Sequence, residues 1–254
     1  MIKLKTSAEL EKMRIAGKLT ANCLKVAENI IRPGISTYAI DREIKNYLLG
    51  KGATPSFLRL YGFPNSACIS VNEEVLHGIP SKSKILKEGD IVSVDVGACY
   101  EGYNGDSTKT FPVGKISDEA KKLLKVTEEA LYAAVDVAVV GARLGDIGSC
   151  IEKIVRGNGY GLLLNFCGHG IGRDMHEDPE VPNYGQAGKG LRLQAGMTIA
   201  IEPMVNVKGD DVYILKDKWT VVPKSHSLSA HFEHTVAITD NGPEILTLPD
   251  EDYL

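Results

Sequence analysis

Gly89-Asp-Ile-Val-Ser-Val-Asp95 recurs 107 residues later as Gly196-Met-Thr-Ile-Ala-Ile-Glu202. In both stretches a glycine precedes a short, mostly apolar run of the kind that forms a buried strand, and a carboxylate ends it. A helical pattern with its start and stop glycines repeats at the same offset: Gly34, Ile40, Ile44, Gly50 and Gly52 recur as Gly141, Ile147, Ile151, Gly157 and Gly159. The repeat predicts two similar halves, about 7–113 and 117–240, whose equivalent carboxylates converge on the seam between them.

The remaining pattern alternates between helical periodicity and short apolar runs, which predicts an α+β fold. Helices are expected at 7–32, 36–50, 117–140 and 144–156, with Ser7 and Ser117 as N-caps. Strands are expected at 91–97, 105–113, 197–202, 212–215, 229–239 and 244–246. A chain of 254 residues is long enough to bury one large core, so we expect a single domain over 1–254.

Composition excludes several classes of protein. No stretch approaches the roughly 18 uncharged apolar residues that cross a bilayer, and the charged N-terminus does not look like a signal peptide. Five widely spaced cysteines without a Cys-x-x-Cys pair argue against a disulfide framework or a zinc ribbon. A net charge of −4 without a sustained basic block gives no reason to expect nucleic-acid binding. We therefore expect a cytoplasmic protein with no membrane partner and no specific nucleic-acid partner.

Two aspartates flank the turn at 100–103 between the first pair of strands. If the turn is centred between Tyr100 and Glu101, Asp95 and Asp106 lie directly opposite each other, with Cβ atoms about 5 Å apart. Two like charges at that distance repel, and burying them requires a cation or a shared proton. A solvated turn would avoid the problem, but the run around Asp95 is apolar enough to be buried on both faces.

A glycine-rich loop, Cys167-Gly-His-Gly-Ile-Gly-Arg173, places an imidazole between glycines that would let the backbone approach a ligand. A phosphate-binding loop is the competing interpretation, but it requires a following helix. Pro179 and Pro182 make a helix there improbable. We therefore interpret His169 as a metal ligand and His176, seven residues later, as a second functional imidazole.

Two glutamates complete an acidic set. Glu202 ends a buried run before Pro203, and Glu233 lies in another strand-like run. With the two aspartates and His169 they make four carboxylates and one imidazole, a donor set suited to Mn²⁺, Fe²⁺, Co²⁺ or Zn²⁺. Four negative charges need about two divalent cations, and a carboxylate such as Asp106 or Glu233 can bridge two ions. The sequence thus favours a dinuclear centre.

His77 and Trp219 are weaker candidates. Gly78 and Pro80 predict a turn that presents the His77 ring outwards. Trp219 is the only tryptophan, and a place in the core explains it as well as a place in a substrate pocket does.

With these residues placed, the chain closely resembles the type I methionine aminopeptidases, in the short form without an N-terminal extension. The resemblance covers nearly the whole length. It is carried by a set of motifs in this order: Cys68-Ile-Ser-Val-Asn72, His77-Gly-Ile-Pro80, Val94-Asp-Val-Gly97, Asn104-Gly-Asp-Ser-Thr108, Cys167-Gly-His-Gly-Ile-Gly172, Glu202-Pro203 and Phe232-Glu-His-Thr235.

The resemblance implies the pita-bread fold, two pseudo-symmetric α/β halves around a curved antiparallel sheet. It also implies a hydrolase that removes the initiator methionine from nascent polypeptides with a small second residue. It further implies a monomer with a transient ribosome contact. The implied ligands of two divalent ions (Co, Mn, Fe or Zn), bridged by the attacking hydroxide, are Asp95, Asp106, His169, Glu202 and Glu233.

The resemblance also assigns roles around the metals. Glu202 would shuttle a proton, His176 would stabilise the oxyanion and His77 would bind the scissile amide. The residues that match the methionine pocket are Phe57, Phe63, Cys68, Met175 and Trp219.

The chain departs from the family pattern at Leu60, Tyr61 and Met175 in the pocket, and at His231, where glutamine is usual. His231 lies two residues from Glu233 on the same strand face and could perturb the metals or the pH profile. Two alternatives remain. A proline-directed relative such as prolidase would carry a further N-terminal domain, and a silent binding protein would be expected to have lost a ligand.

Overall fold

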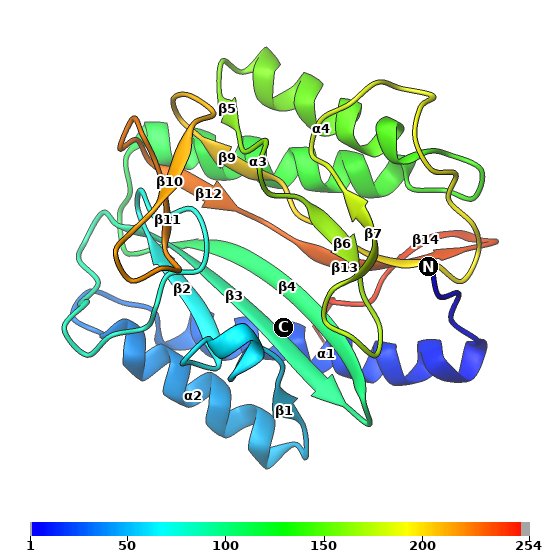
Figure 1. Cartoon of the computed structure of the whole chain (residues 1–254). Helices are drawn as coiled ribbons and strands as arrows, with labels where there is room; N and C mark the ends of the chain where they lie inside the picture. The colour runs from blue at the N-terminus through cyan, green and yellow to red at the C-terminus, as the bar shows by residue number, and fades with distance from the viewer. Residues whose placement is uncertain (1, 250–254) are drawn as a thin grey trace.

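The computed structural model describes residues 2–249. Two pairs of helices enclose the strands from opposite sides (Figure 1), with α1 and α2 below and α3 and α4 above. Their bounds are α1 Ser7–Ile30, α2 Thr37–Gly50, α3 Asp118–Val137 and α4 Leu144–Gly157, and a short 3₁₀ turn, η1, spans Leu60–Gly62. The four predicted helices are thus present, although α3 ends three residues before the predicted end.

Helix starts follow side-chain capping. Ser36 and Ser117 accept hydrogen bonds from the backbone N–H groups three residues later, which satisfies otherwise unpaired donors. The first helix is capped by Thr6, so the prediction of Ser7 was wrong by one residue. Thr6 is preferred because Glu9 stands three residues after it and its carboxylate accepts a hydrogen bond from the Thr6 backbone N–H, forming a capping box.

All paired strands are antiparallel. Those of the first half are β1 Thr54–Pro55, β2 Ala67–Val71, β3 Ile91–Tyr100 and β4 Tyr103–Pro112. Those of the second half are β5 Gly161–Leu162, β6 Gly168–Gly170, β7 Glu177–Val181, β8 Thr198–Ile201, β9 Met204–Asn206, β10 Val212–Ile214, β11 Val221–Pro223, β12 Ser229–His231, β13 His234–Thr239 and β14 Gly242–Ile245. The fold class is α+β, as predicted.

The hairpin of β3 and β4 has a different register from the predicted one. Its turn is centred between Glu101 and Gly102, both with positive φ (48° and 78°), as a tight two-residue hairpin turn requires. Asp106 therefore lies opposite Gly97 and not opposite Asp95. The shift is two residues, so both aspartates stay on one face of the hairpin as diagonal neighbours.

The predicted strand at 229–239 is two strands. Phe232 and Glu233 separate β12, which pairs with β9, from β13, which pairs with β8. The Glu233 N–H leaves this ladder and donates to the Thr108 carbonyl on β4 (2.9 Å). This hydrogen bond connects the two halves at Glu233, the residue that projects its carboxylate toward the site.

The repeated glycines have matching backbone geometry. Gly34 and Gly141 have φ of 90° and 92°, and Gly89 and Gly196 have 91° and 88°. Non-glycine residues rarely adopt such values, so the same turns recur before equivalent helices and strands. The largest apolar clusters follow the same division: one packs α1 and α2 on β3, and another packs α3 and α4 on β8 and β13.

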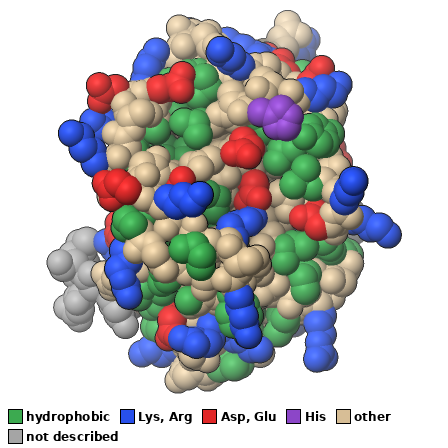
Figure 2. All heavy atoms as spheres, turned by 90° about the vertical axis from the view of Figure 1, so that its left-hand side faces the viewer, with side chains coloured by type: hydrophobic (Ala, Val, Ile, Leu, Met, Phe, Trp, Pro, Cys, Tyr) green, Lys and Arg blue, Asp and Glu red, His purple; other side chains and the backbone are tan. Residues whose placement is uncertain are grey.

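No described helix is long and apolar enough to cross a membrane. The face that carries β10 and β11 (Figure 2) shows basic and acidic side chains interspersed, without a continuous block of one sign.

Candidate functional site

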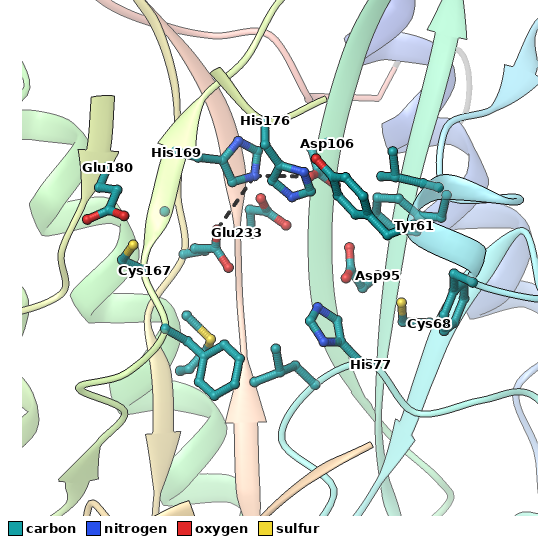
Figure 3. Close-up of a pocket in the computed structure, with 18 of the residues that line it drawn as sticks. Tyr61, Cys68, His77, Asp95, Asp106, Cys167, His169, His176, Glu180 and Glu233 are labelled. Carbon is teal, nitrogen blue, oxygen red and sulfur yellow. Dashed lines mark ion pairs between the residues drawn. The ribbon is translucent and has the colours of Figure 1, made fainter. Parts of the chain in front are cut away.

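His169 lies at the centre of a cluster of carboxylates between the two halves (Figure 3). Its Nδ1 lies 2.8 Å from the carbonyl of Gly170 and donates a hydrogen to it, which leaves the lone pair of Nε2 free. That Nε2 lies 3.6 Å from Asp106 Oδ2 and 3.8 Å from Glu202 Oε1. The imidazole therefore presents an acceptor nitrogen to the acidic side chains, as a metal ligand does.

Gly168 and Gly170, beside His169, allow close packing of neighbouring strands. The sequence had instead predicted that they let the backbone approach a ligand. A Cβ on Gly168 would lie 2.2 Å from the Ala200 carbonyl oxygen, and a Cβ on Gly170 would lie 2.1 Å from that of Asp178. Only glycine lets β6 lie this close to β8 and to the β7 segment. The tight packing fixes the position from which His169 projects.

The carboxylates of the cluster are buried without adequate partners. Asp95 Oδ1 and Asp106 Oδ1 are fully buried and have no hydrogen-bond partner among the described residues. Glu233 receives one hydrogen bond, from the Thr108 hydroxyl to Oε2 (2.8 Å). Burial raises the pKa of all three acids, and repulsion from Asp106 raises the pKa of Asp95 and of Glu233 further.

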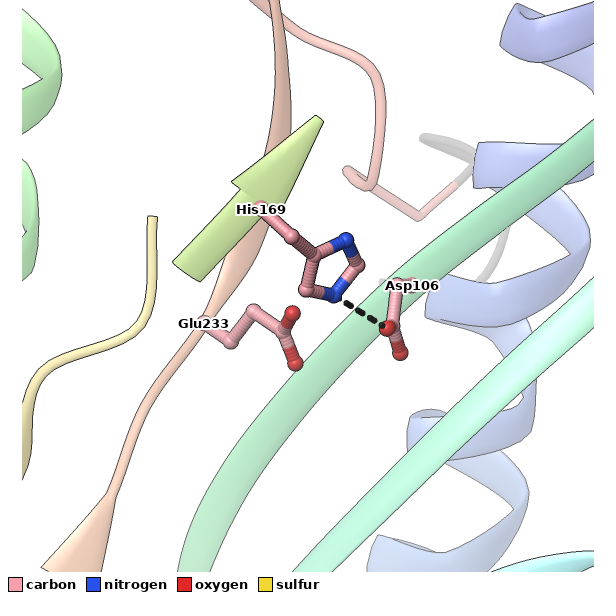
Figure 4. A group of neighbouring side chains, drawn as sticks. All are labelled: Asp106, His169 and Glu233. Carbon is pink, nitrogen blue, oxygen red and sulfur yellow. Dashed lines mark ion pairs between the residues drawn. The ribbon is translucent and has the colours of Figure 1, made fainter. Parts of the chain in front are cut away.

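The donor set fits divalent cations. Ligand atoms of Asp106, His169 and Glu233 all lie within 4.8 Å of one another (Figure 4). Glu202 reaches the same imidazole from the second half, and Asp95 adds an unpartnered oxygen from the first. Mutually repelling carboxylates in a buried cluster are tolerated when cations compensate them.

These pKa shifts predict that metal stabilises the fold more as pH rises. The raised folded-state pKa values mean that the metal-free protein loses free energy of unfolding as pH rises above the ordinary carboxyl range. Cations bind the ionised acids and reverse this loss. Thermal unfolding with and without Mn²⁺ should show a small gain in Tm near pH 5 and a larger gain near pH 7.5. An equal gain at every pH would contradict the prediction.

Two further imidazoles flank the cluster and are neutral at pH 7. Burial lowers the pKa of both His77 and His176 to about 4. The His176 ring lies 4.4 Å from that of His169, edge to face. Exposed Tyr61 stacks on the other side of His176, with ring centroids 5.8 Å apart. Each neutral imidazole can donate one hydrogen bond to a polar group of a substrate.

The carboxylates form the floor of a cavity of about 520 Å³. Apolar and aromatic side chains line part of its wall, where the rings of Phe63 and Trp219 meet edge to face at 5.1 Å, and the acidic residues Glu177, Asp178 and Glu180 line another part. Of the predicted site residues, those that line it are Phe57, Phe63, Cys68, His77, Asp95, Asp106, His169, His176, Glu202, Trp219 and Glu233. Met175 does not line the cavity. It is 5% exposed and packs in the apolar cluster of Phe57 and Phe63 behind the wall.

Sequence reasoning missed part of the wall, namely Leu76, Phe166, Cys167, Gly168, Glu177, Asp178, Glu180 and Met204. Phe166 directly precedes the glycine-rich loop, and Met204 directly follows Glu202-Pro203. Their position next to the predicted ligands could have identified both as wall residues. Thr108 was also missed as a partner of Glu233, because its role depends on a contact across 125 residues of sequence.

Comparison with known proteins places this geometry in a family. Residues 11–240 match metallopeptidase family M24. The methionine aminopeptidase of Clostridium acetobutylicum is 52% identical over 248 residues, which cover 98% of this chain and 99% of that protein. The crystal structure of the methionine aminopeptidase of Thermotoga maritima superposes with a TM-score of 0.96 at 45% identity, covering 98% of this chain and 100% of that one.

A prolidase shares the fold. The prolidase of Pyrococcus furiosus superposes with a TM-score of 0.80 at 28% identity. The match covers 98% of this chain but 66% of the prolidase. These structural neighbours confirm the pita-bread fold.

Proposed function

The chain belongs to metallopeptidase family M24, and from that premise we propose that it is a metal-dependent aminopeptidase that removes the N-terminal methionine from peptides and nascent proteins. The observation that supports this proposal most directly is a cavity in which the acidic cluster with His169 lies beside apolar and aromatic side chains. A free α-amino group that has lost its proton would be a ligand for an ion held by that cluster, whereas the nitrogen of an internal peptide bond would not. The arrangement therefore favours hydrolysis at the first residue of a chain over internal cleavage.

We propose that Asp95, Asp106, His169, Glu202 and Glu233 hold two divalent ions. The unpartnered oxygens of the aspartates and the free Nε2 of His169 support this assignment. Bound ions of this kind act as Lewis acids and bring the pKa of water to about 7. We assign two ions because four carboxylates on one floor exceed the charge of a single divalent cation.

The protein's own groups would bind the peptide and move its protons. Glu202, at the cluster edge, would take a proton from the attacking water and pass it to the leaving amine. His176, neutral at pH 7, would donate a hydrogen bond to the carbonyl oxygen as negative charge develops there. His77, on the opposite wall, would hold the scissile amide in place.

The cavity walls suit a methionine side chain. Phe57, Phe63, Cys68 and Trp219 form an apolar part of the cavity wall. The unbranched thioether of methionine fits such a pocket and makes favourable contacts with aromatic rings. We propose further that the second residue must be small.

Peptide hydrolysis tests the proposal against the proline-directed alternative. Purified protein with Co²⁺ or Mn²⁺ should release methionine from Met-Ala-Ser and little from Met-Lys-Ser, and it should leave Ala-Pro intact. Free amino acids are quantified by chromatography over a time course, with a chelator-treated sample as control. Cleavage of Ala-Pro alone would favour prolidase-like activity, and cleavage of none of the peptides would support a binding protein.

We also propose where and in what form the protein acts. The five cysteines are free thiols, which is compatible with the reducing cytoplasm, where nascent N-termini emerge. We propose a monomer, with 1–254 as a single catalytic domain of two repeats, about 7–113 and 117–240. Contact with the ribosome would be transient.

A further inference from the structure

His231 is a buried histidine that the proposed chemistry leaves unused. It ends β12, its exposed fraction is 2%, and it does not line the cavity. Its Nε2 lies 3.4 Å from Glu202 Oε2. This nitrogen is one of four buried side-chain polar atoms in residues 2–249 without a hydrogen-bond partner. A buried polar atom without a hydrogen-bond partner lowers the stability of the fold, so its presence beside a carboxylate calls for an explanation.

The backbone of His231 is fixed to the neighbouring half. The Thr110 hydroxyl accepts from the His231 N–H (3.0 Å) and donates to the His231 carbonyl (2.8 Å). Ser93 Oγ lies 2.8 Å from the same hydroxyl. Because the Thr110 hydrogen is already used, Ser93 must be the donor in that contact. The chain therefore holds the imidazole beside Glu202 and gives it little freedom to move away.

The Glu202 carboxylate depends on its neighbours for orientation. Asn183 Nδ2 donates to the Glu202 backbone carbonyl (2.8 Å), but no described protein group makes a hydrogen bond to the carboxylate. Its two oxygens face two imidazoles instead. Oε1 lies 3.8 Å from His169 Nε2, and Oε2 lies 3.4 Å from His231 Nε2.

We propose that His231 is a positioning residue whose Nε2–H donates to Glu202 Oε2 and so directs Oε1 toward His169 and the metals. This inference rests on the proposed function, which makes Glu202 a metal ligand and proton carrier. Donors behind a ligating carboxylate typically contribute about 10- to 100-fold to metal affinity or activity. A small rotation of either side chain would align the contact as a hydrogen bond.

Direct metal ligation by His231 is the competing role. The donors that lie mutually within 4.8 Å are Asp106, His169 and Glu233, and His231 is not among them. It also does not line the cavity on whose floor those donors lie. Both observations favour a place behind Glu202.

Three substitutions separate a hydrogen-bond donor from a space filler. In His231→Gln the amide nitrogen reaches nearly as far from Cβ as imidazole Nε2 does, whereas in His231→Asn it is one carbon shorter. His231→Leu fills similar space without a donor. For each variant we would measure the affinity for Co²⁺ by calorimetry, the Co²⁺ absorption spectrum, and kcat and KM for Met-Ala-Ser.

We expect His231→Leu and His231→Asn to weaken Co²⁺ affinity and lower kcat by about 10- to 100-fold, and His231→Gln to restore both. His234→Leu is the control: His234 is a half-buried imidazole next to Glu233 in the sequence, with Nδ1 at Thr247 Oγ1 (2.8 Å), and it lines a separate cavity. It should lower Tm without changing Co²⁺ affinity.

Two results would overturn the inference. One is a His231→Leu protein with unchanged affinity and kcat. The other is a His231→Gln protein as impaired as His231→Leu, with an altered Co²⁺ spectrum, which would show that the imidazole ligates the ion. The wild-type protein tests the proposed function separately, because it must cleave Met-Ala-Ser in either case.

Discussion

Replacing Asp106 by asparagine will abolish methionine release from Met-Ala-Ser. The carboxylate lies within 4.8 Å of the donors of both His169 and Glu233, and it is the diagonal neighbour of Asp95 on the hairpin, so it stands among the donors of both halves. An amide has the same shape but no charge, and it is a far weaker ligand. The loss should exceed the roughly 10- to 100-fold that follows removal of a group behind a ligand.

The fold will survive this substitution. The Asp106 backbone N–H and carbonyl both bond to the Thr235 hydroxyl (3.0 and 2.8 Å), independently of the carboxylate. In metal-free protein, loss of one buried charge also relieves repulsion on Asp95 and Glu233. Circular dichroism should therefore show a native spectrum, and the gain in Tm on adding Mn²⁺ should nearly vanish. Turnover at the wild-type rate would rule out the assigned role.

Replacing His176 by alanine will lower kcat for Met-Ala-Ser by about 10²- to 10³-fold, the effect of removing one donor to a developing oxyanion. KM should change much less, because the donor acts mainly when negative charge develops. Calorimetry with Co²⁺ should give wild-type stoichiometry, since His176 is not assigned as a ligand. Steady-state kinetics measure the two constants separately.

The wild-type pH profile provides a further check on His176. Its pKa of about 4 keeps the imidazole neutral at every pH above about 5. The difference between wild type and His176→Ala should therefore stay constant from pH 6 to pH 9. An effect confined to KM, or one that disappears within that range, would contradict the role of a neutral donor.

Local patterns predicted the helices and the repeat well. Gly34 and Gly141, or Gly89 and Gly196, are recognisable because only glycine readily adopts the φ near 90° found at these turns. Thr6 could also have been predicted as the N-cap, because Thr6 and Glu9 have the spacing of a capping box.

Features that depend on tertiary contacts were predicted less well. The hairpin register followed from a positive φ at Glu101, which its residue type does not favour. The break at Glu233 depends on its hydrogen bond to the Thr108 carbonyl in the other half. The five predicted ligands do line one cavity. The positions of Asp95, Glu202 and Glu233 were easier to anticipate, since each ends or interrupts an apolar run where a charge has no structural explanation.

We propose that divalent cations make this buried acidic cluster tolerable. Calorimetric titration of chelator-treated protein with Co²⁺ at pH 7.5 is the sharpest test of this proposal. We predict two equivalents bound per chain with release of protons, because carboxylates with raised pKa values must ionise to bind metal. Binding of a single equivalent would contradict the dinuclear centre, and absence of stoichiometric binding would contradict the assignment of these residues as metal ligands.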